Sequence, residues 1–144
     1  MDLLKLAALD EDDLKILSAH AQDAVLKAGD LAWLPNAKRF VLSMNRFAWE
    51  VRGSLFRRRD ERRRSVLSFD RVLGVRSTGI ARAKREEVLS LLAIRFAPAQ
   101  APAGNIELDF ADGGTVRLDV ECIEARLADV GGAWEAAGRP SHGA

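Results

Sequence analysis

Apolar residues recur at helical spacing between Leu14 and Ala24, which predicts a helix with one buried face. Asp10 stands in front of them as an N-cap, and residues 11–13 are all acidic, which suits the positive end of a helix dipole. The helix is therefore predicted to begin at Asp10 and to end before Val25.

The apolar period then changes to two, which predicts strands. Alternating runs at 31–33 and 40–44 flank the segment Pro35-Asn36-Ala37-Lys38, which is typical of a hairpin loop. The second run continues to Val51 with the apolar parity switched, and this predicts a bulge or bend at residues 45–46.

Further strand character lies at 66–75 and at 88–96, where Val88, Leu92 and Phe96 share one parity. Residues 97–104 are predicted to form a loop, because their prolines have no N–H group for a sheet ladder.

The clearest element is a hairpin between residues 106 and 121. A three-residue loop at 112–114 would pair Phe110 with Val116 and place all the apolar side chains on one face. Gly114 would supply the left-handed position in that loop. Ile123, Leu127 and Val130 then recur at helical spacing before Gly131, which predicts a short C-terminal helix.

These elements predict an α+β fold. An N-terminal helix precedes about six antiparallel strands in a meander, which form a strongly curved sheet or partly closed barrel, and a short C-terminal helix follows. A pleckstrin-homology-like roll is the specific expectation. At 144 residues, 48% of them hydrophobic and 30% charged, residues 1–137 are expected to form a single domain and residues 138–144 a disordered tail.

The first residues contain acidic side chains and no long apolar run, so we expect neither export nor membrane spanning, and we expect a cytoplasmic protein. Cys122 is the only cysteine, which excludes an intramolecular disulfide and a thiolate metal cage. It shares the parity of the preceding apolar residues and is predicted to be buried and unreactive.

Candidate catalytic residues are few. The histidines are His20, on the first helix, and His142, in the tail, and neither lies in a pattern typical of nucleophilic catalysis or zinc binding. No glycine-rich phosphate loop follows a strand, so no cofactor is predicted. We expect a protein that is not an enzyme.

Charge is distributed unevenly although the net charge is only +1. Residues 1–30 sum to −4, residues 38–95 to +10 and residues 104–144 to −5. On the last hairpin, Glu107 is expected opposite Asp119, a pairing that indicates a cation, a basic partner or simply a solvated face.

The segment RGSLFRRRDERRR at 52–64 is the sharpest feature, and it is predicted to be an exposed, mobile loop. Its arginines are the candidate anion- or partner-binding residues: Arg52, Arg57, Arg58, Arg59, Arg62, Arg63 and Arg64. The first hypothesis is a non-catalytic interaction module that presents this loop to an acidic protein. The alternative is a weakly specific nucleic-acid-binding protein that uses the same arginines on phosphates. A loop that is merely solvated and self-association through the acidic hairpin face also remain open.

Three segments together carry a resemblance to a known family: LKLAALDEDDLKILSAHAQDAVLKAGDLAWLP near the N-terminus, NRFAWE at 45–50 and FDRVLGVRSTGI at 69–80. They resemble the bacterial family called domain of unknown function 2948. The resemblance implies a free-standing bacterial cytoplasmic protein and brings no reaction, cofactor or functional residue with it.

Overall fold

The computed structural model describes residues 3–47, 62–81 and 84–130. One α-helix and three short 3₁₀ turns lie in these ranges: α1 (Glu11–Ala21), η1 (Ala28–Asp30), η2 (Pro35–Ala37) and η4 (Ala111–Gly113). The first five strands are β1 (Lys5–Ala8), β2 (Val25–Lys27), β3 (Leu31–Leu34), β4 (Arg39–Phe47) and β5 (Arg62–Phe69). The other five are β6 (Val72–Thr78), β7 (Val88–Pro98), β8 (Gly104–Phe110), β9 (Thr115–Val120) and β10 (Ala125–Asp129).

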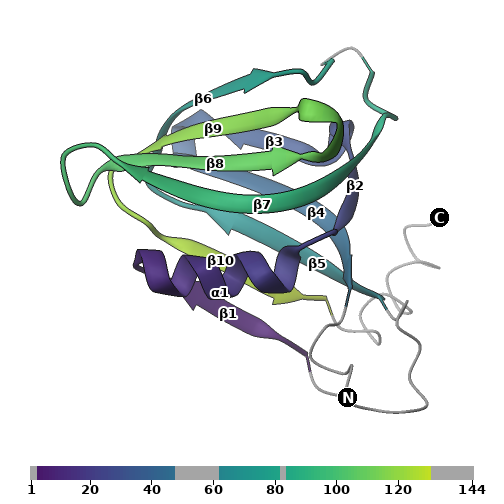
Figure 1. The fold of residues 1–144 in the computed structure, drawn as a ribbon, viewed down its shortest axis with the longest axis horizontal. Coiled ribbons are helices and arrows are strands. Elements are labelled where there is room, and N and C mark those ends of the chain that lie inside the picture. The colour runs from purple at the N-terminus through teal and green to yellow at the C-terminus, as the bar shows by residue number, and fades with distance from the viewer. Residues whose placement is uncertain (1–2, 48–61, 82–83, 131–144) are drawn as a thin grey trace.

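These strands form one antiparallel sheet in the order β1-β10-β5-β4-β2-β7-β8-β9-β6, and β3 pairs with β4 beside this path (Figure 1). The sheet is not a simple meander, because β10 inserts between β1 and β5 and β2 inserts between β4 and β7. It is also not closed. Within the described chain, β6 pairs only with β9 and β3 pairs only with β4.

The two halves of the sheet face each other around one hydrophobic core. Figure 1 shows β6, β9, β8 and β7 in front of β3, β4 and β5. The helix α1 contacts β1, β4 and β7, so it connects both halves, and it buries Leu14, Leu17 and Ala21. Its predicted N-cap is confirmed, because the Asp13 N–H donates to Oδ1 of Asp10 at 2.8 Å.

The predicted C-terminal helix is wrong, because residues 125–129 form strand β10 between β1 and β5. Ile123 and Leu127 are four residues apart, a spacing that fits both the helical period and the strand period of two. Ala125 and Asp129 are buried as well, so every second residue from 123 to 129 faces inward, which is the alternation of a strand. The α+β class with two helices and the pleckstrin-homology-like roll are therefore wrong. The described chain is mainly antiparallel sheet with one α-helix.

The β8–β9 hairpin buries the predicted face in a different register. Leu108, and not Phe110, lies opposite Val116, and the Phe110 N–H donates to the carbonyl oxygen of Gly114 at 2.8 Å. The loop is η4, where Asp112 and Gly113 have φ of 70° and 90°. Aspartate tolerates the left-handed region, so the turn closes one residue earlier than predicted. The pairing between β8 and β9 is therefore shifted by two residues from the predicted register. Because side chains alternate with a period of two, the same side chains still face the core.

Two further strands differ from their predicted patterns. β4 has no parity switch, since Arg46 occupies the next inward position after Met44 and is 0% exposed. The irregularity lies instead in β7, between Leu91 and Ala93. This irregularity changes which residues of β7 face the core, so Val88 and Leu92 lie on the solvent side and are 64% and 46% exposed.

Candidate functional site

Three of the predicted binding arginines lie at the start of β5 and not in a loop. Arg62 and Arg64 are exposed on the outer side of the sheet. Arg63 lies on the inner side, where its Nη1 is 4.0 Å from Oδ2 of Asp129. The loop prediction was therefore wrong for these three residues, because strand alternation separates them onto two faces. Four predicted residues lie outside the described ranges: Arg52, Arg57, Arg58 and Arg59.

Arg62 and Arg64 belong to a larger basic surface on the outer side of β1, β10, β5, β4 and β2. The outward positions of these strands hold basic residues and no acidic residue. We call this surface the basic face, and it consists of Lys5, Lys27, Arg39, Arg62, Arg64 and Arg126. Between them lie mostly small outward side chains: Ala7, Val41, Ser43, Val66, Ser68 and Ala128. The larger outward neighbours on β4 are Asn45, opposite Arg64, and Phe47, opposite Arg62.

Part of this charge is compensated. Asp70, at the end of β5, accepts from Nε of Arg39 at 2.6 Å and from Nη2 of Arg126 at 2.9 Å. Lys27 donates to Oε1 of Glu86 at 2.8 Å, and this hydrogen bond raises the pKa of Lys27 and lowers the pKa of Glu86.

The remaining cations of the basic face are less constrained. Within the described ranges, no carboxylate lies at ion-pair distance from Lys5, Arg62 or Arg64. The guanidinium of Arg62 lies over the ring of Phe47, 4.6 Å from its centroid. These three side chains are therefore the ones that can bind an external anion without breaking an ion pair.

The outer side of the other half of the sheet is balanced. Arg95 on β7 donates to Asp109 at 2.6 Å and to Glu107 at 2.7 Å, and Arg117 on β9 lies 3.5 Å from Glu107. The predicted pairing of Glu107 with Asp119 is wrong, since Arg117 lies opposite Glu107 in the observed register. The acidic hairpin face expected from the sequence is thus neutralised within the molecule.

A buried ion pair underlies the basic face. Arg46 on β4 donates to Asp129 on β10, from Nε to Oδ1 and from Nη2 to Oδ2, both at 2.8 Å. Ser65 Oγ and the Leu4 N–H donate to the same carboxylate at 2.6 and 3.0 Å. Burial raises the pKa of Asp129, but the hydrogen bonds from Arg46, Ser65 and Leu4 lower it by more, so it lies below its usual range.

This pair was missed at the sequence level. The sequence does contain one indication of the pair. Arg46 and Asp129 each stand at the next alternate position after a run of inward-facing apolar residues in their strand. A charged residue at such a position indicates a buried partner of opposite sign.

A cavity of about 270 Å³ lies between the two halves of the sheet, where β3 and β6 leave it open. In the part of the chain that the structure describes, its wall is mainly apolar and carries one hydroxyl and one guanidinium. The lining residues are Ala28, Leu31, Trp33, Phe40, Val75, Ser77, Ile80, Arg85 and Val116.

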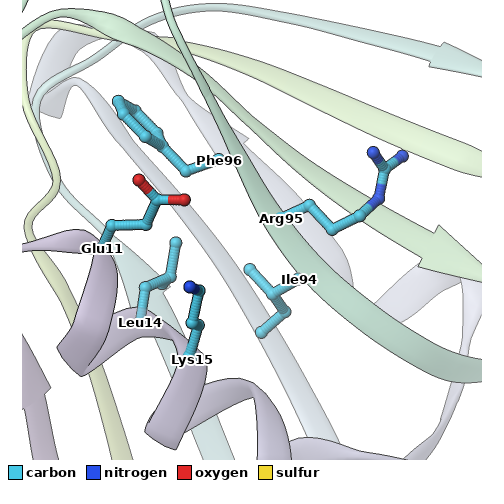
Figure 2. A pocket seen from close by; sticks show the side chains of 6 residues that line it. All are labelled: Glu11, Leu14, Lys15, Ile94, Arg95 and Phe96. Carbon is cyan, nitrogen blue, oxygen red and sulfur yellow. The ribbon is translucent and has the colours of Figure 1, made fainter.

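A second hollow, of about 300 Å³, lies between α1 and β7. Figure 2 shows Glu11 and Lys15 on the helix, and Arg95 pointing away from both. Because Arg95 is held by Asp109 and Glu107, its guanidinium is turned away from this groove (Figure 2). The charged groups that line it are Glu11 and Lys15, which are of opposite sign.

Other candidate chemistry is sparse in the part of the chain that the structure describes. His20 is half-buried in the last turn of α1, and His142 lies outside the described residues. Cys122 was predicted to be buried but is half-buried, because β9 ends at Val120 and the strand parity is not continued. In the described ranges, no group of three histidine, cysteine, aspartate or glutamate side chains is placed to hold a metal. No helix there has the length and apolar character that crossing a membrane requires.

Comparison with known proteins identifies a family for this chain. No curated protein and no solved structure matches the chain. The model of the family described as protein of unknown function (DUF2948) matches residues 4–142, nearly the whole chain. This finding confirms the resemblance carried by the three sequence segments, and the chain belongs to the DUF2948 family.

Proposed function

We propose that this protein is a non-catalytic interaction module that binds an acidic protein through its basic face. The observation that carries the proposal is the one-sided charge of the outer sheet surface. The outward positions of β1, β10, β5, β4 and β2 hold six basic residues and no acidic residue, whereas Arg95 and Arg117 are paired with carboxylates on the opposite side.

Arginine suits such a contact because its planar guanidinium forms two parallel hydrogen bonds to one carboxylate. Arg62 and Arg64 lie two residues apart on one side of β5, so they are separated by roughly 7 Å along the strand. Their cross-strand neighbours on β4 are Phe47, over which Arg62 lies, and Asn45, so neither arginine faces a carboxylate across the strand pair. An acidic segment lying along β5 can therefore reach both guanidinium groups at once.

Two observations favour a protein partner over nucleic acid. Single-stranded nucleic acids are usually bound by stacking bases on exposed aromatic side chains. The large apolar residues exposed in the described ranges are all aliphatic, and Phe47 on the basic face is covered by Arg62. The segments 1–30 and 104–144, which sum to −4 and −5, also repel duplex DNA, with one charge per ~1.7 Å, more strongly than an extended acidic peptide, with at most one charge per ~3.3 Å.

The test measures binding of three fluorescent probes to the full chain across a range of salt concentrations. The probes are a glutamate polymer, random duplex DNA and random single-stranded RNA. We expect the glutamate polymer to bind, and the double variant Arg62→Gln/Arg64→Gln to bind it roughly three- to tenfold more weakly, as two exposed ion pairs allow. We expect neither nucleic acid to be retained at physiological salt.

The matched control is the double variant Arg76→Gln/Arg117→Gln. It removes the same charge from a cross-strand pair on the balanced side of the sheet, and it should bind the glutamate polymer like the wild type. If the chain instead retained RNA or DNA with a steep logarithmic dependence on salt, lost in the Arg62/Arg64 variant, the nucleic-acid alternative would replace this proposal. Equal binding of the glutamate polymer by both variants would also overturn it.

A further inference from the structure

We infer that the cavity between β3 and β6 binds a small organic anion with an apolar body, of the class of aliphatic or aromatic monocarboxylates. This site is separate from the basic face, because its lining side chains come from the inner side of the sheet. Leu31 and Trp33 lie on β3, Phe40 on β4, Val75 and Ser77 on β6.

The wall of the cavity determines the apolar body of the ligand. Trp33 and Phe40 lie directly opposite each other in the β3–β4 pair, and Val116 faces Ser77 in the β6–β9 pair. The volume of about 270 Å³ corresponds to about nine water molecules at the ~30 Å³ that each occupies in the liquid. A ligand of roughly that many non-hydrogen atoms fits inside the cavity.

Arg85 determines the charge of the ligand, because among the described residues that line this cavity it is the one with an ionisable side chain. Its backbone is fixed against Gly29, whose N–H donates to the Arg85 carbonyl oxygen at 2.8 Å, while Arg85 Nη2 donates back to the Gly29 carbonyl oxygen at 3.3 Å. A Cβ atom at position 29 would lie 3.2 Å from Cζ of Arg85. Because glycine has no Cβ atom, the Arg85 guanidinium can pack directly against the backbone of residue 29. The remaining N–H groups suit a carboxylate, which accepts two parallel hydrogen bonds.

Ser77 is the other polar side chain among the described residues that line the cavity. It is half-buried and lies inward on β6, and its hydroxyl can donate to the same carboxylate. Small-molecule sites commonly combine such an apolar wall with a few polar groups. β3 and β6 both supply lining residues and are not paired with each other, so a ligand that enters between them breaks no sheet hydrogen bond.

The lining residue Trp33 provides the measurement. The chain has three tryptophans, so the background Trp49→Phe/Trp134→Phe leaves Trp33 as the one fluorescent reporter. The probe is hexanoate, and hexanamide is the uncharged comparison of similar shape. We expect a saturable change in Trp33 emission with hexanoate and an affinity at least about tenfold lower for hexanamide, because the amide loses the charge-assisted hydrogen bonds.

Substitution of Arg85 makes the test specific to this cavity. Arg85 is exposed, so Arg85→Gln is compatible with folding, and it should weaken hexanoate binding by about tenfold or more while leaving hexanamide unchanged. The control Arg76→Gln removes the same charge from the outer side of β6 and should leave both affinities unchanged. The inference is overturned if hexanoate produces no saturable response, if it binds no better than hexanamide, or if Arg85→Gln binds it like the control.

Discussion

Arg46 on β4 and Asp129 on β10 are joined by two hydrogen bonds of 2.8 Å, although the intervening strand β5 separates their strands. Both side chains are 0% exposed. Ser65 of β5 donates to the same carboxylate, so a single buried group ties together the three strands that carry most of the basic face. We expect the packing of these three strands to require that neither buried charge is left without its partner.

Removing one member of the pair should be costly. Arg46→Met leaves the Asp129 carboxylate buried without its main partner, and we expect a loss of about 3–5 kcal/mol in the free energy of unfolding, measured by denaturant titration. The double variant Arg46→Met/Asp129→Leu removes both charges and should recover much of that loss. A single variant that costs less than about 1 kcal/mol would contradict the buried pair.

The same pair predicts how stability depends on pH. Because the pKa of Asp129 is lowered in the folded protein, its stabilising contribution is fully present above the ordinary carboxyl value of 3.8 and is lost as the pH falls through the folded value. The difference in unfolding free energy between the wild type and Asp129→Asn should therefore be constant from about pH 8 to pH 5 and shrink below about pH 4. A difference that stays constant down to pH 2 would show that this pKa is not lowered.

Gly104 tests the packing of the turn between β7 and β8. A Cβ atom there would lie 2.5 Å from the carbonyl oxygen of Ala97 and 2.6 Å from Cζ of Phe96, so Gly104→Ala should destabilise the protein by about 1–3 kcal/mol. Gly74→Ala is the matched control, since its nearest contact would be Oδ2 of Asp119 at 3.6 Å. Thermal unfolding of both variants makes the comparison, and equal melting temperatures would contradict the packing.

Much of the secondary structure could be predicted because local chemistry determines it. The Asp10 cap, the α1 face with Leu14 and Leu17, and the turn at Pro35–Ala37 follow from capping, helical periodicity and proline geometry. The inward face of the last hairpin was also predicted, although its register was not. Sequence alternation determines which side is buried, whereas the turn conformation at Asp112 and Gly113 determines the pairing.

The remaining features depend on contacts between residues far apart in the chain. Nothing near β10 indicates that it inserts between β1 and β5, and Ile123 and Leu127 fit a helix and a strand equally well. The basic face was only partly predicted for the same reason. Arg62 and Arg64 were identified from their local cluster, but Lys5 and Arg126 join them only through the pairing of β1, β10 and β5.

The most direct test of the basic face is crosslinking in an extract of the cells that produce the protein, before and after treatment of the extract with nuclease. Three forms of the full chain are compared: the wild type, Arg62→Gln/Arg64→Gln, and Arg76→Gln/Arg117→Gln. We predict that the wild type and the Arg76/Arg117 control capture the same acidic protein, and that the Arg62/Arg64 variant, equally stable because its changes are exposed, loses it. Capture of the same protein by all three forms, or capture that disappears on nuclease treatment, would contradict the account.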